Sequence, residues 1–430
     1  MIDVIGGGFA GCEAAWIAAR LGAQVRLWEM RPAKPTPAHK TGLLAELVCS
    51  NSFKSSNRHS PAGQLKWEME QLGSLMIPTA LKHQVPGGEA LCVDREAFAS
   101  EMTAAIASHP RIELIRKEWT GADTDHPVVV ATGPLSSDAI SRWIETRTGS
   151  GRLFFFDAVS PTVTAESVDF CLAWEQDRYD KGDGSYVNCP MNREEYDAFV
   201  SALVSAERST PHLESETRYF EGCMPIEVIA QRGRDSLRFG NFKPVGLTNP
   251  HTGGRAYAVL QLRQENAQKS LYSMVACQTT LKWSEQKRVF RMVPGLQNAE
   301  FVRYGVMHRN TYLDSPRLLD ARLRLRDSQT FFAGQITGVE GYVESGATGI
   351  LAGLFACVSD EIPPPPRECA LGSLIAHVTN TDSPDYAPMN INWGLFPDPG
   401  TLGDKSVRRE AKLRAATEAF LKWRETLPLP

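Results

Sequence analysis

Three glycines near the start of the chain have the spacing of a phosphate-binding turn. Gly6, Gly8 and Gly11 follow an apolar run at residues 2–5 and precede a segment with helical periodicity. In such a turn the first glycine allows the tight bend, the second lets a pyrophosphate approach the backbone, and the third allows close packing of helix and strand. The free amides and the positive end of the helix then attract the phosphates. This pattern predicts dinucleotide binding, the alternative being a glycine turn that serves packing alone.

An acidic residue stands where the ribose of such a dinucleotide would lie. Glu29 follows Gly11 by 18 residues and ends a second apolar run at residues 25–29. Its carboxylate can accept hydrogen bonds from ribose hydroxyls. The residues expected to contact the dinucleotide in this first part of the chain are Gly6, Gly7, Gly8, Phe9, Ala10, Gly11, Glu29 and Arg31.

The far end of the chain favours FAD over NAD. Residues 330–335 resemble a strand and are followed by a glycine-rich loop containing Gly338, Gly341, Gly346 and Gly349, and then by an apolar helix from residue 350. A helix that begins there can face a flavin and stabilise negative charge on its reduced ring. The expected contacts are Gly334, Gln335 and Gly341, together with Ala131, Thr132 and Gly133 at the end of another buried strand. Only one glycine fingerprint is present, so a nicotinamide reductant is expected to bind transiently.

The elements that position these residues predict an α/β fold. The chain has 430 residues, of which 42% are hydrophobic, and this length allows two or three domains. We expect a Rossmann-like FAD-binding domain of the glutathione-reductase type with an inserted α/β domain. The first part of the FAD-binding domain is assigned to residues 1–155, the inserted domain to 156–300, and the second part to 301–430. Residues 405–424 are expected to form a basic amphipathic helix with Leu413, Ala416, Phe420 and Trp423 on one side.

Composition and cysteine usage exclude other classes of protein. The net charge of −4 rules out a polycation that holds nucleic acid along its whole surface. The nine cysteines form no CxxC pair and no cluster with zinc spacing, so we expect no metal site and a reduced, cytoplasmic protein. No secretory leader is expected, and the longest apolar stretch, around residues 350–358, is too short to cross a membrane.

Segments spread over residues 4–396 resemble the folate- and FAD-dependent tRNA (uracil-5-)-methyltransferases, the TrmFO family. They occur in the order of that family and cover nearly the whole chain. The segments are residues 29–32 (EMRP), 48–52 (VCSNS), 93–96 (VDRE), 131–135 (ATGPL), 188–191 (NCPM), 220–225 (FEGCMP), 243–247 (KPVGL), 259–263 (VLQLR), 304–311 (YGVMHRNT), 338–342 (GVEGY) and 392–395 (NWGL).

The resemblance implies a flavin-dependent methylation of tRNA. In that family reduced flavin takes a one-carbon unit from methylenetetrahydrofolate and delivers it to uridine-54 in the T-loop, which gives 5-methyluridine, and NADH or NADPH supplies the electrons. The implied cofactor is FAD, and the implied co-substrates are methylenetetrahydrofolate and NAD(P)H.

Two cysteines match the family's paired thiols. Carbon 5 of uracil becomes nucleophilic after a thiolate adds at carbon 6, and the proton on carbon 5 must then be removed. We assign Cys223 as the nucleophile and Cys49 as the group that handles the proton, although the reverse order remains open. The other cysteines are interpreted as packing residues: Cys12, Cys92, Cys171, Cys189, Cys277, Cys357 and Cys369.

Two basic segments are candidate RNA contacts. Residues 282–326 contain ten Lys or Arg and four Asp or Glu, and residues 401–430 contain seven and four. Unpaired bases could stack on Phe290, Phe301, Tyr304 and Tyr312, and the RNA or folate pocket could include His308 and Arg309. The alternatives are an ordinary solvated charged face, the same chemistry on ribosomal RNA, a wobble-uridine modifier, and a flavin-bearing RNA-binding protein without catalysis.

Overall fold

Five parallel strands drawn from both ends of the chain form one sheet. The computed structural model describes residues 1–121, 124–149, 153–158, 160–180, 185–209, 224–305, 307–358, 360–381 and 386–429, with only the backbone of 153–158 and 307–311. The strand order in the sheet is β16-β7-β1-β2-β6. The strands are β1 (Ile2–Ile5), β2 (Val25–Trp28), β6 (Ile112–Ile115), β7 (Val128–Val130) and β16 (Thr330–Phe332). Because β16 pairs with β7, the C-terminal part of the sequence lies beside the N-terminal βαβ unit.

Helices and a small antiparallel sheet pack around this parallel sheet. The helices are α1 (Phe9–Arg20), α2 (Pro61–Gln71), α3 (Met76–Lys82), α4 (Arg95–Ser108), α5 (Asp138–Thr148), α10 (Ser315–Leu318), α11 (Tyr342–Phe355), α12 (Ala370–Val378) and α13 (Lys405–Arg424). The small sheet has the order β3-β5-β4, with β3 at Ser52–Ser55, β4 at Gln84–Val85 and β5 at Ala90–Val93. These elements share one hydrophobic core with the parallel sheet.

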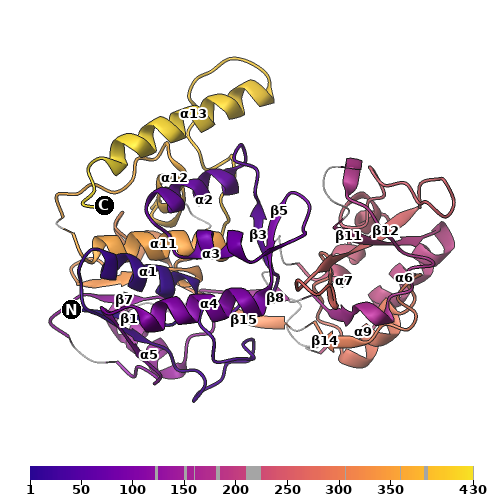
Figure 1. Cartoon of the computed structure of the whole chain (residues 1–430), viewed down its shortest axis with the longest axis horizontal. Helices are drawn as coiled ribbons and strands as arrows, with labels where there is room; N and C mark the ends of the chain where they lie inside the picture. Colours follow the sequence, from indigo (N-terminus) through magenta and orange to yellow (C-terminus); the bar gives the residue numbers. More distant parts are fainter. Residues whose placement is uncertain are drawn as a thin grey trace.

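The middle of the chain forms a second core around a six-stranded antiparallel sheet, on the right of Figure 1. Its order is β10 (Trp174–Glu175), β11 (Tyr186–Met191), β12 (Ala258–Gln264), β13 (Leu271–Met274), β9 (Thr162–Thr164) and β14 (Phe301–Arg303). Its helices are α6 (Arg193–Ser205), α7 (Ile226–Gln231), α8 (Ser236–Phe239) and α9 (Trp283–Phe290). We call this part the inserted domain.

A pair of antiparallel strands runs between the two sheets. It consists of β8 (Leu153–Ala158) and β15 (Met307–Tyr312). Of the boundaries assigned from the sequence, 155/156 falls within β8 and 300/301 falls immediately before β14. The predicted α/β class with a Rossmann-type parallel sheet is confirmed.

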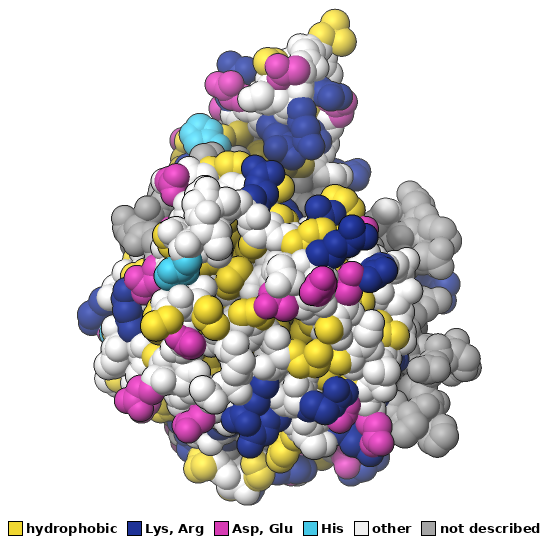
Figure 2. All heavy atoms as spheres, turned by 90° about the vertical axis from the view of Figure 1, so that its right-hand side faces the viewer, with side chains coloured by type: hydrophobic (Ala, Val, Ile, Leu, Met, Phe, Trp, Pro, Cys, Tyr) yellow, Lys and Arg dark blue, Asp and Glu magenta, His cyan; other side chains and the backbone are white. Residues whose placement is uncertain are grey.

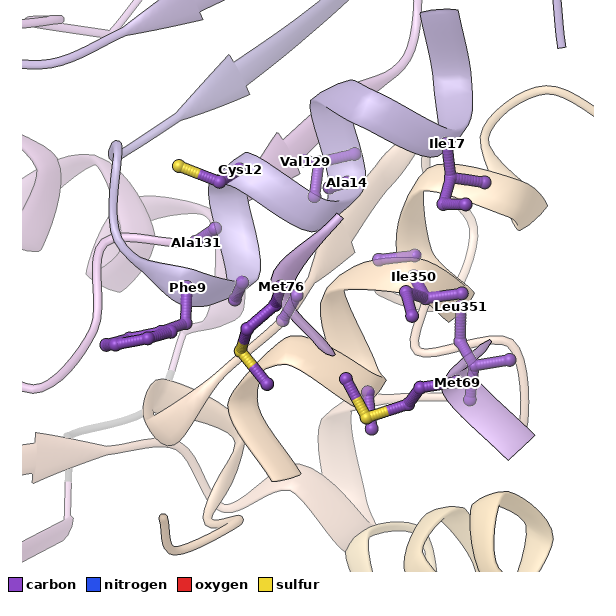
Figure 3. Close-up of a cluster of buried hydrophobic side chains, with 14 of the residues drawn as sticks. Phe9, Cys12, Ala14, Ile17, Met69, Met76, Val129, Ala131, Ile350 and Leu351 are labelled. Atoms are coloured by element: carbon purple, nitrogen blue, oxygen red, sulfur yellow. The ribbon is translucent and has the colours of Figure 1, made fainter. Parts of the chain in front are cut away.

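Helices α1 and α11 pack with their backbones in contact. A Cβ atom added at Gly349 would lie 2.2 Å from the carbonyl oxygen of Ala10, and one added at Gly353 would lie 2.4 Å from that of Ala14. Figure 3 shows side chains of both helices, among them Ile17 and Ile350, in the buried cluster next to this contact. The prediction of a glycine-rich loop reaching Gly349 is wrong, because α11 already begins at Tyr342. Its glycines serve close helix packing.

The C-terminal helix covers the edge of the first core. Helix α13 occupies residues 405–424, as the sequence predicted, and Asp404 caps its first turn. Ala416, Phe420 and Trp423 are buried, and the Trp423 indole donates to the carbonyl of Pro363 at 2.8 Å. Lys412 and Arg424 donate to backbone carbonyls of the first core, and the other cations of the helix are exposed: Lys405, Arg408, Arg409, Arg414 and Lys422.

Two alanine substitutions on α11 test the helix contact. Gly349→Ala inserts a methyl group against the carbonyl of Ala10, and we expect it to lower the free energy of unfolding by about 2 kcal/mol or more. In Gly346→Ala the new methyl would meet the flexible ends of Met69 and Met76, 3.1–3.2 Å away, so stability should stay within about 1 kcal/mol of the parent. Urea unfolding measures both, and equal stabilities of the two variants would contradict the packing argument.

Candidate functional site

The glycine turn between β1 and α1 has an open cradle at its centre. Gly6 has φ +103°, and a Cβ there would lie 2.6 Å from the carbonyl oxygen of Ala131. A Cβ at Gly11 would lie 1.7 Å from the carbonyl oxygen of Gly6, so the helix starts against the strand. At Gly8 a Cβ would meet no atom within 4 Å. The first and third glycines therefore serve the bend and the packing, and the second faces empty space.

Glu29 fixes this turn from the neighbouring strand. Its carboxylate accepts from the amide of Gly7 at 3.0 Å and from the amide of Arg31 at 2.9 Å. The guanidinium of Arg31 donates to both Glu29 oxygens and to Glu46 at 3.1 Å. Although burial opposes ionisation, these hydrogen bonds and the positive charge of Arg31 lower the pKa of Glu29. An ionised carboxylate is thus present at the end of β2, as ribose recognition requires.

These residues line one long groove over the carboxyl ends of the parallel strands. Counting its open mouth, the groove holds about 1050 Å³ of space, which is ample for a dinucleotide. The predicted residues that line it are Gly6, Gly7, Gly8, Phe9, Ala10, Glu29, Arg31, Ala131, Thr132, Gly133, Gly334 and Gln335. Gly11 and Gly341 are not among the lining residues.

The groove also includes residues that the sequence analysis did not single out. Trp28 lies on β2, residues 117–119 follow β6, and residues 134–137 continue the turn after β7. Tyr342 and Ser345 enter the lining from α11. The 338–342 segment resembled the family pattern, so Tyr342 carried a signal, but nothing in its spacing showed which residue it meets.

Cys49 is not among the lining residues, but it contacts Tyr342, which lines the groove. The Cys49 amide donates to the Tyr342 hydroxyl at 2.9 Å, and the Cys49 Sγ lies 2.9 Å from the same oxygen. The Tyr342 ring packs on Phe9 with centroids 4.6 Å apart. Burial raises the pKa of Tyr342 well above its usual value, so the hydroxyl keeps its proton. With its oxygen occupied by the amide, this hydroxyl can turn its proton toward the sulfur.

Two guanidinium groups hold the backbone around Cys49. Arg95, at the start of α4, donates to the carbonyls of Leu47 at 2.7 Å and Cys49 at 3.4 Å. Arg303, on β14 of the inserted domain, donates to the carbonyl of Val48 at 3.3 Å. Arg95 also pairs with the buried carboxylate of Glu265, at the end of β12. The backbone of residues 47–49 is therefore fixed from both parts of the molecule.

The second predicted catalytic residue, Cys223, lies outside the described residues. Of the cysteines interpreted as packing residues, five are buried: Cys12, Cys92, Cys189, Cys277 and Cys369. Burial raises the pKa of Cys189 to about 12. The interpretation is wrong for Cys171, which is exposed on the segment between β9 and β10. Cys357 is half-buried at the end of α11.

The predicted base-stacking residues divide into two groups. Phe290 is fully buried in the core of the inserted domain, and Tyr312 is 3% exposed and packs against Tyr386, so the expectation is wrong for both. Phe301 and Tyr304 are half-buried, and their rings stack on each other. The side chains of residues 308 and 309 lie outside the described part.

Neither a metal site nor a membrane span was found in the described part of the chain. No group of three or more His, Cys, Asp or Glu side chains there is arranged to hold a metal ion. Among the helices given above, none is both long and apolar enough to cross a bilayer.

Known proteins resemble the chain over almost its full length. The family model for glucose inhibited division protein A matches residues 1–360. A methylenetetrahydrofolate--tRNA-(uracil-5-)-methyltransferase TrmFO of Moorella thermoacetica is 53% identical over 401 residues, which is 92% of each chain. The protein of the same name from Heliobacterium modesticaldum is 52% identical over 425 residues, which is 97% of each chain. GidA of Aquifex aeolicus shares the fold with a TM-score of 0.69 and 16% identity, over 98% of this chain and 73% of that one.

Thiol labelling tests the environments of the cysteines. We expect iodoacetamide at pH 8 to label Cys49 and Cys171 first in the native protein, and the five buried cysteines at least tenfold more slowly. Burial keeps those thiols protonated and shields them from the reagent. Peptide mass spectrometry measures each rate, and labelling in guanidinium chloride provides the unfolded control. Rapid native labelling of Cys189 or Cys277 would contradict the structure.

Proposed function

The chain belongs to the TrmFO family of methylenetetrahydrofolate--tRNA-(uracil-5-)-methyltransferases, and we propose from this premise that it forms 5-methyluridine at uridine-54 in the T-loop of tRNA. Methylenetetrahydrofolate donates the carbon and NAD(P)H supplies the electrons. The reaction takes place in the cytoplasm. The observation that carries the proposal is the Cys49 thiol, which lies 2.9 Å from the hydroxyl of Tyr342, a residue that lines the dinucleotide groove.

The groove fits FAD. The open space at Gly8 suits the pyrophosphate, the ionised Glu29 suits the ribose, and Gly334 and Gln335 line the same groove next to Tyr342 of α11. When bound, the flavin supplies the redox chemistry that turns the one-carbon unit into a methyl group. The residues of the groove bind and orient it.

Cys49 and Cys223 divide the work on the uracil ring. We assign to Cys223 the addition at carbon 6, which activates carbon 5, and to Cys49 the removal of the carbon 5 proton. Tyr342 supports the second role, because its hydroxyl can donate to a Cys49 thiolate and can accept from the thiol. Arg95 and Arg303 position the backbone of Cys49 and place two positive charges near its sulfur.

Cationic side chains supply the contact with RNA phosphates. Figure 2 shows Lys and Arg side chains on the upper projection, which α13 forms, and others among hydrophobic side chains on the inserted domain. The exposed cations of α13 include Arg408, Arg409 and Arg414. A basic surface on a protein of net charge −4 binds RNA locally, and its affinity falls as salt rises.

An isotope-transfer assay tests the reaction. The protein is incubated anaerobically with unmethylated tRNA, NADH and methylenetetrahydrofolate labelled in its one-carbon unit, and the nucleosides are read by mass spectrometry. We expect labelled 5-methyluridine in the T-loop fragment, and a loss of at least 100-fold in Cys49→Ala and in Cys223→Ala. A Cys171→Ala control should retain activity, because that thiol is exposed in the inserted domain, which contributes no residue to the groove lining. If only ribosomal RNA were labelled, the proposed tRNA substrate would be wrong. If neither RNA were labelled, the proposed methyltransferase activity would be rejected.

Gly8→Val tests the cradle at the glycine turn. A Cβ at Gly8 would meet no protein atom within 4 Å. Without FAD, the free energy of unfolding of the variant should therefore lie within about 1 kcal/mol of that of the parent. The added side chain occupies the space left for the pyrophosphate, so FAD affinity should fall at least tenfold. Flavin fluorescence titration measures the affinity, and unchanged binding would show that the pyrophosphate lies elsewhere.

A further inference from the structure

Three aromatic rings of the inserted domain form a continuous stack. The Trp283 ring lies 5.2 Å from that of Tyr304 with 11° between their planes, and Tyr304 lies 5.3 Å from Phe301 with 4° between their planes. Trp283 begins α9, Phe301 begins β14, and Tyr304 follows β14 directly. We call these three residues the aromatic stack.

At one end of the aromatic stack, the ring of Trp283 is exposed to solvent. Trp283 is 62% exposed, whereas Phe301 and Tyr304 are half-buried. Within the described part of the chain, Tyr304 is the only ring that Trp283 contacts, and no hydrogen bond is made by its indole nitrogen. By contrast, the buried Phe199 ring makes tilted contacts with Phe242 and Phe290 in the domain core. One face of Trp283 packs on Tyr304, and the rest of its ring is open to solvent and available to stack with a base.

Hydrogen bonds connect the chain around the aromatic stack with the residue before Cys49 and with Ser209 and Ile226. Arg303, between Phe301 and Tyr304 in the chain, donates to the carbonyl of Val48, beside Cys49. On the other side, the amides of Ser209 and Ile226 donate to the carbonyls of Thr280 and Gln278. These two residues flank the segment that contains Cys223, and their partners lie just before Trp283 in the chain.

The charges around the aromatic stack favour a polyanion. Lys282, Lys287 and Arg288 lie beside Trp283 in the sequence. Lys282 pairs with Glu207 at 2.6 Å and Arg288 with Glu285 at 2.6 Å, both pairs being on the surface. Surface pairs of this kind contribute little to stability and can exchange partners for a phosphate. Lys287 makes no ion pair within the described part of the chain.

We propose that the aromatic stack is a platform for an unpaired base of the substrate RNA, adjacent to the uridine that is modified. The proposal rests on the proposed function. A uridine that enters the groove leaves its loop, and the base next to it loses a stacking partner. Trp283 offers that base a flat aromatic face, and the neighbouring cations bind the flanking phosphates. Such stacking on an aromatic side chain is independent of base identity.

Substitution of Trp283 tests the platform. In Trp283→Ala and Trp283→Leu, which remove the flat ring, the Kd for unmethylated tRNA transcript should rise about tenfold or more, and KM should rise more than kcat falls. Trp283→Phe keeps an aromatic ring, so its Kd for the same tRNA should lie within about threefold of the parent's. Phe239→Ala removes another exposed aromatic residue of the same domain, 74% exposed on α8, and should bind as the parent does.

Two further readouts separate stacking from a structural effect. Stacking releases no counterions, so the slope of log Kd against log salt concentration should be the same in Trp283→Ala and in the parent. A 2-aminopurine placed beside the target uridine should be quenched on binding the parent and not on binding Trp283→Ala. FAD content and thermal unfolding confirm that each variant is folded.

The outcomes distinguish this proposal from the proposed function. If the parent binds and methylates tRNA and Trp283→Ala does so equally well, the platform is rejected and the function stands. If the parent neither binds nor methylates tRNA, both are rejected. A parallel loss in Phe239→Ala would also overturn the platform, because the effect would then not be specific to the aromatic stack.

Discussion

The contact between the backbones of α1 and α11 determines where everything else in the site lies. Glycines at 349 and 353 allow the two helices to approach until a single methyl group would collide with a carbonyl oxygen. This approach brings residues from the first and the last third of the sequence to the same groove. It also sets the start of α11, from which Tyr342 reaches Cys49, 293 residues earlier in the chain. A shift of one helix along the other would therefore displace the groove and the thiol together.

A second constraint is the ionised carboxylate of Glu29. It lies at the end of β2, is 5% exposed, and bonds both the glycine turn and Arg31. An unpaired charge at that depth would be costly, so Arg31 neutralises it while leaving it ionised. The same group thus stabilises the glycine turn and places an ionised carboxylate at the end of β2.

Local patterns in the sequence predicted those parts of the site that depend on neighbours in the chain. The glycine turn, the position of Glu29 and the helix at 405–424 follow from spacing and periodicity, because the cause of each lies within about 20 residues. The hydroxyl of Tyr342 and the ion pair of Arg95 with Glu265 depend on tertiary structure, so no spacing revealed them. Burial also depends on tertiary structure. Phe290 and Tyr312, which were expected to stack on bases, are buried, whereas Trp283, which was not predicted, is exposed. The glycines of α11 were misread as a loop, since glycine signals both turns and close helix contacts.

The hold on residues 47–49 from two domains has an evolutionary consequence. The inserted domain contributes Arg303 and Glu265, and the FAD-binding part contributes Arg95. Arg95 bonds the Cys49 carbonyl directly, whereas Arg303 and Glu265 act on Cys49 through the carbonyl of Val48 and through Arg95. The two parts of the gene are therefore not free to drift independently or to be exchanged between distant lineages. Relatives that lose the carboxylate at position 265 are expected to change position 95 as well, so that covariation across the domain boundary records the docking of the two parts.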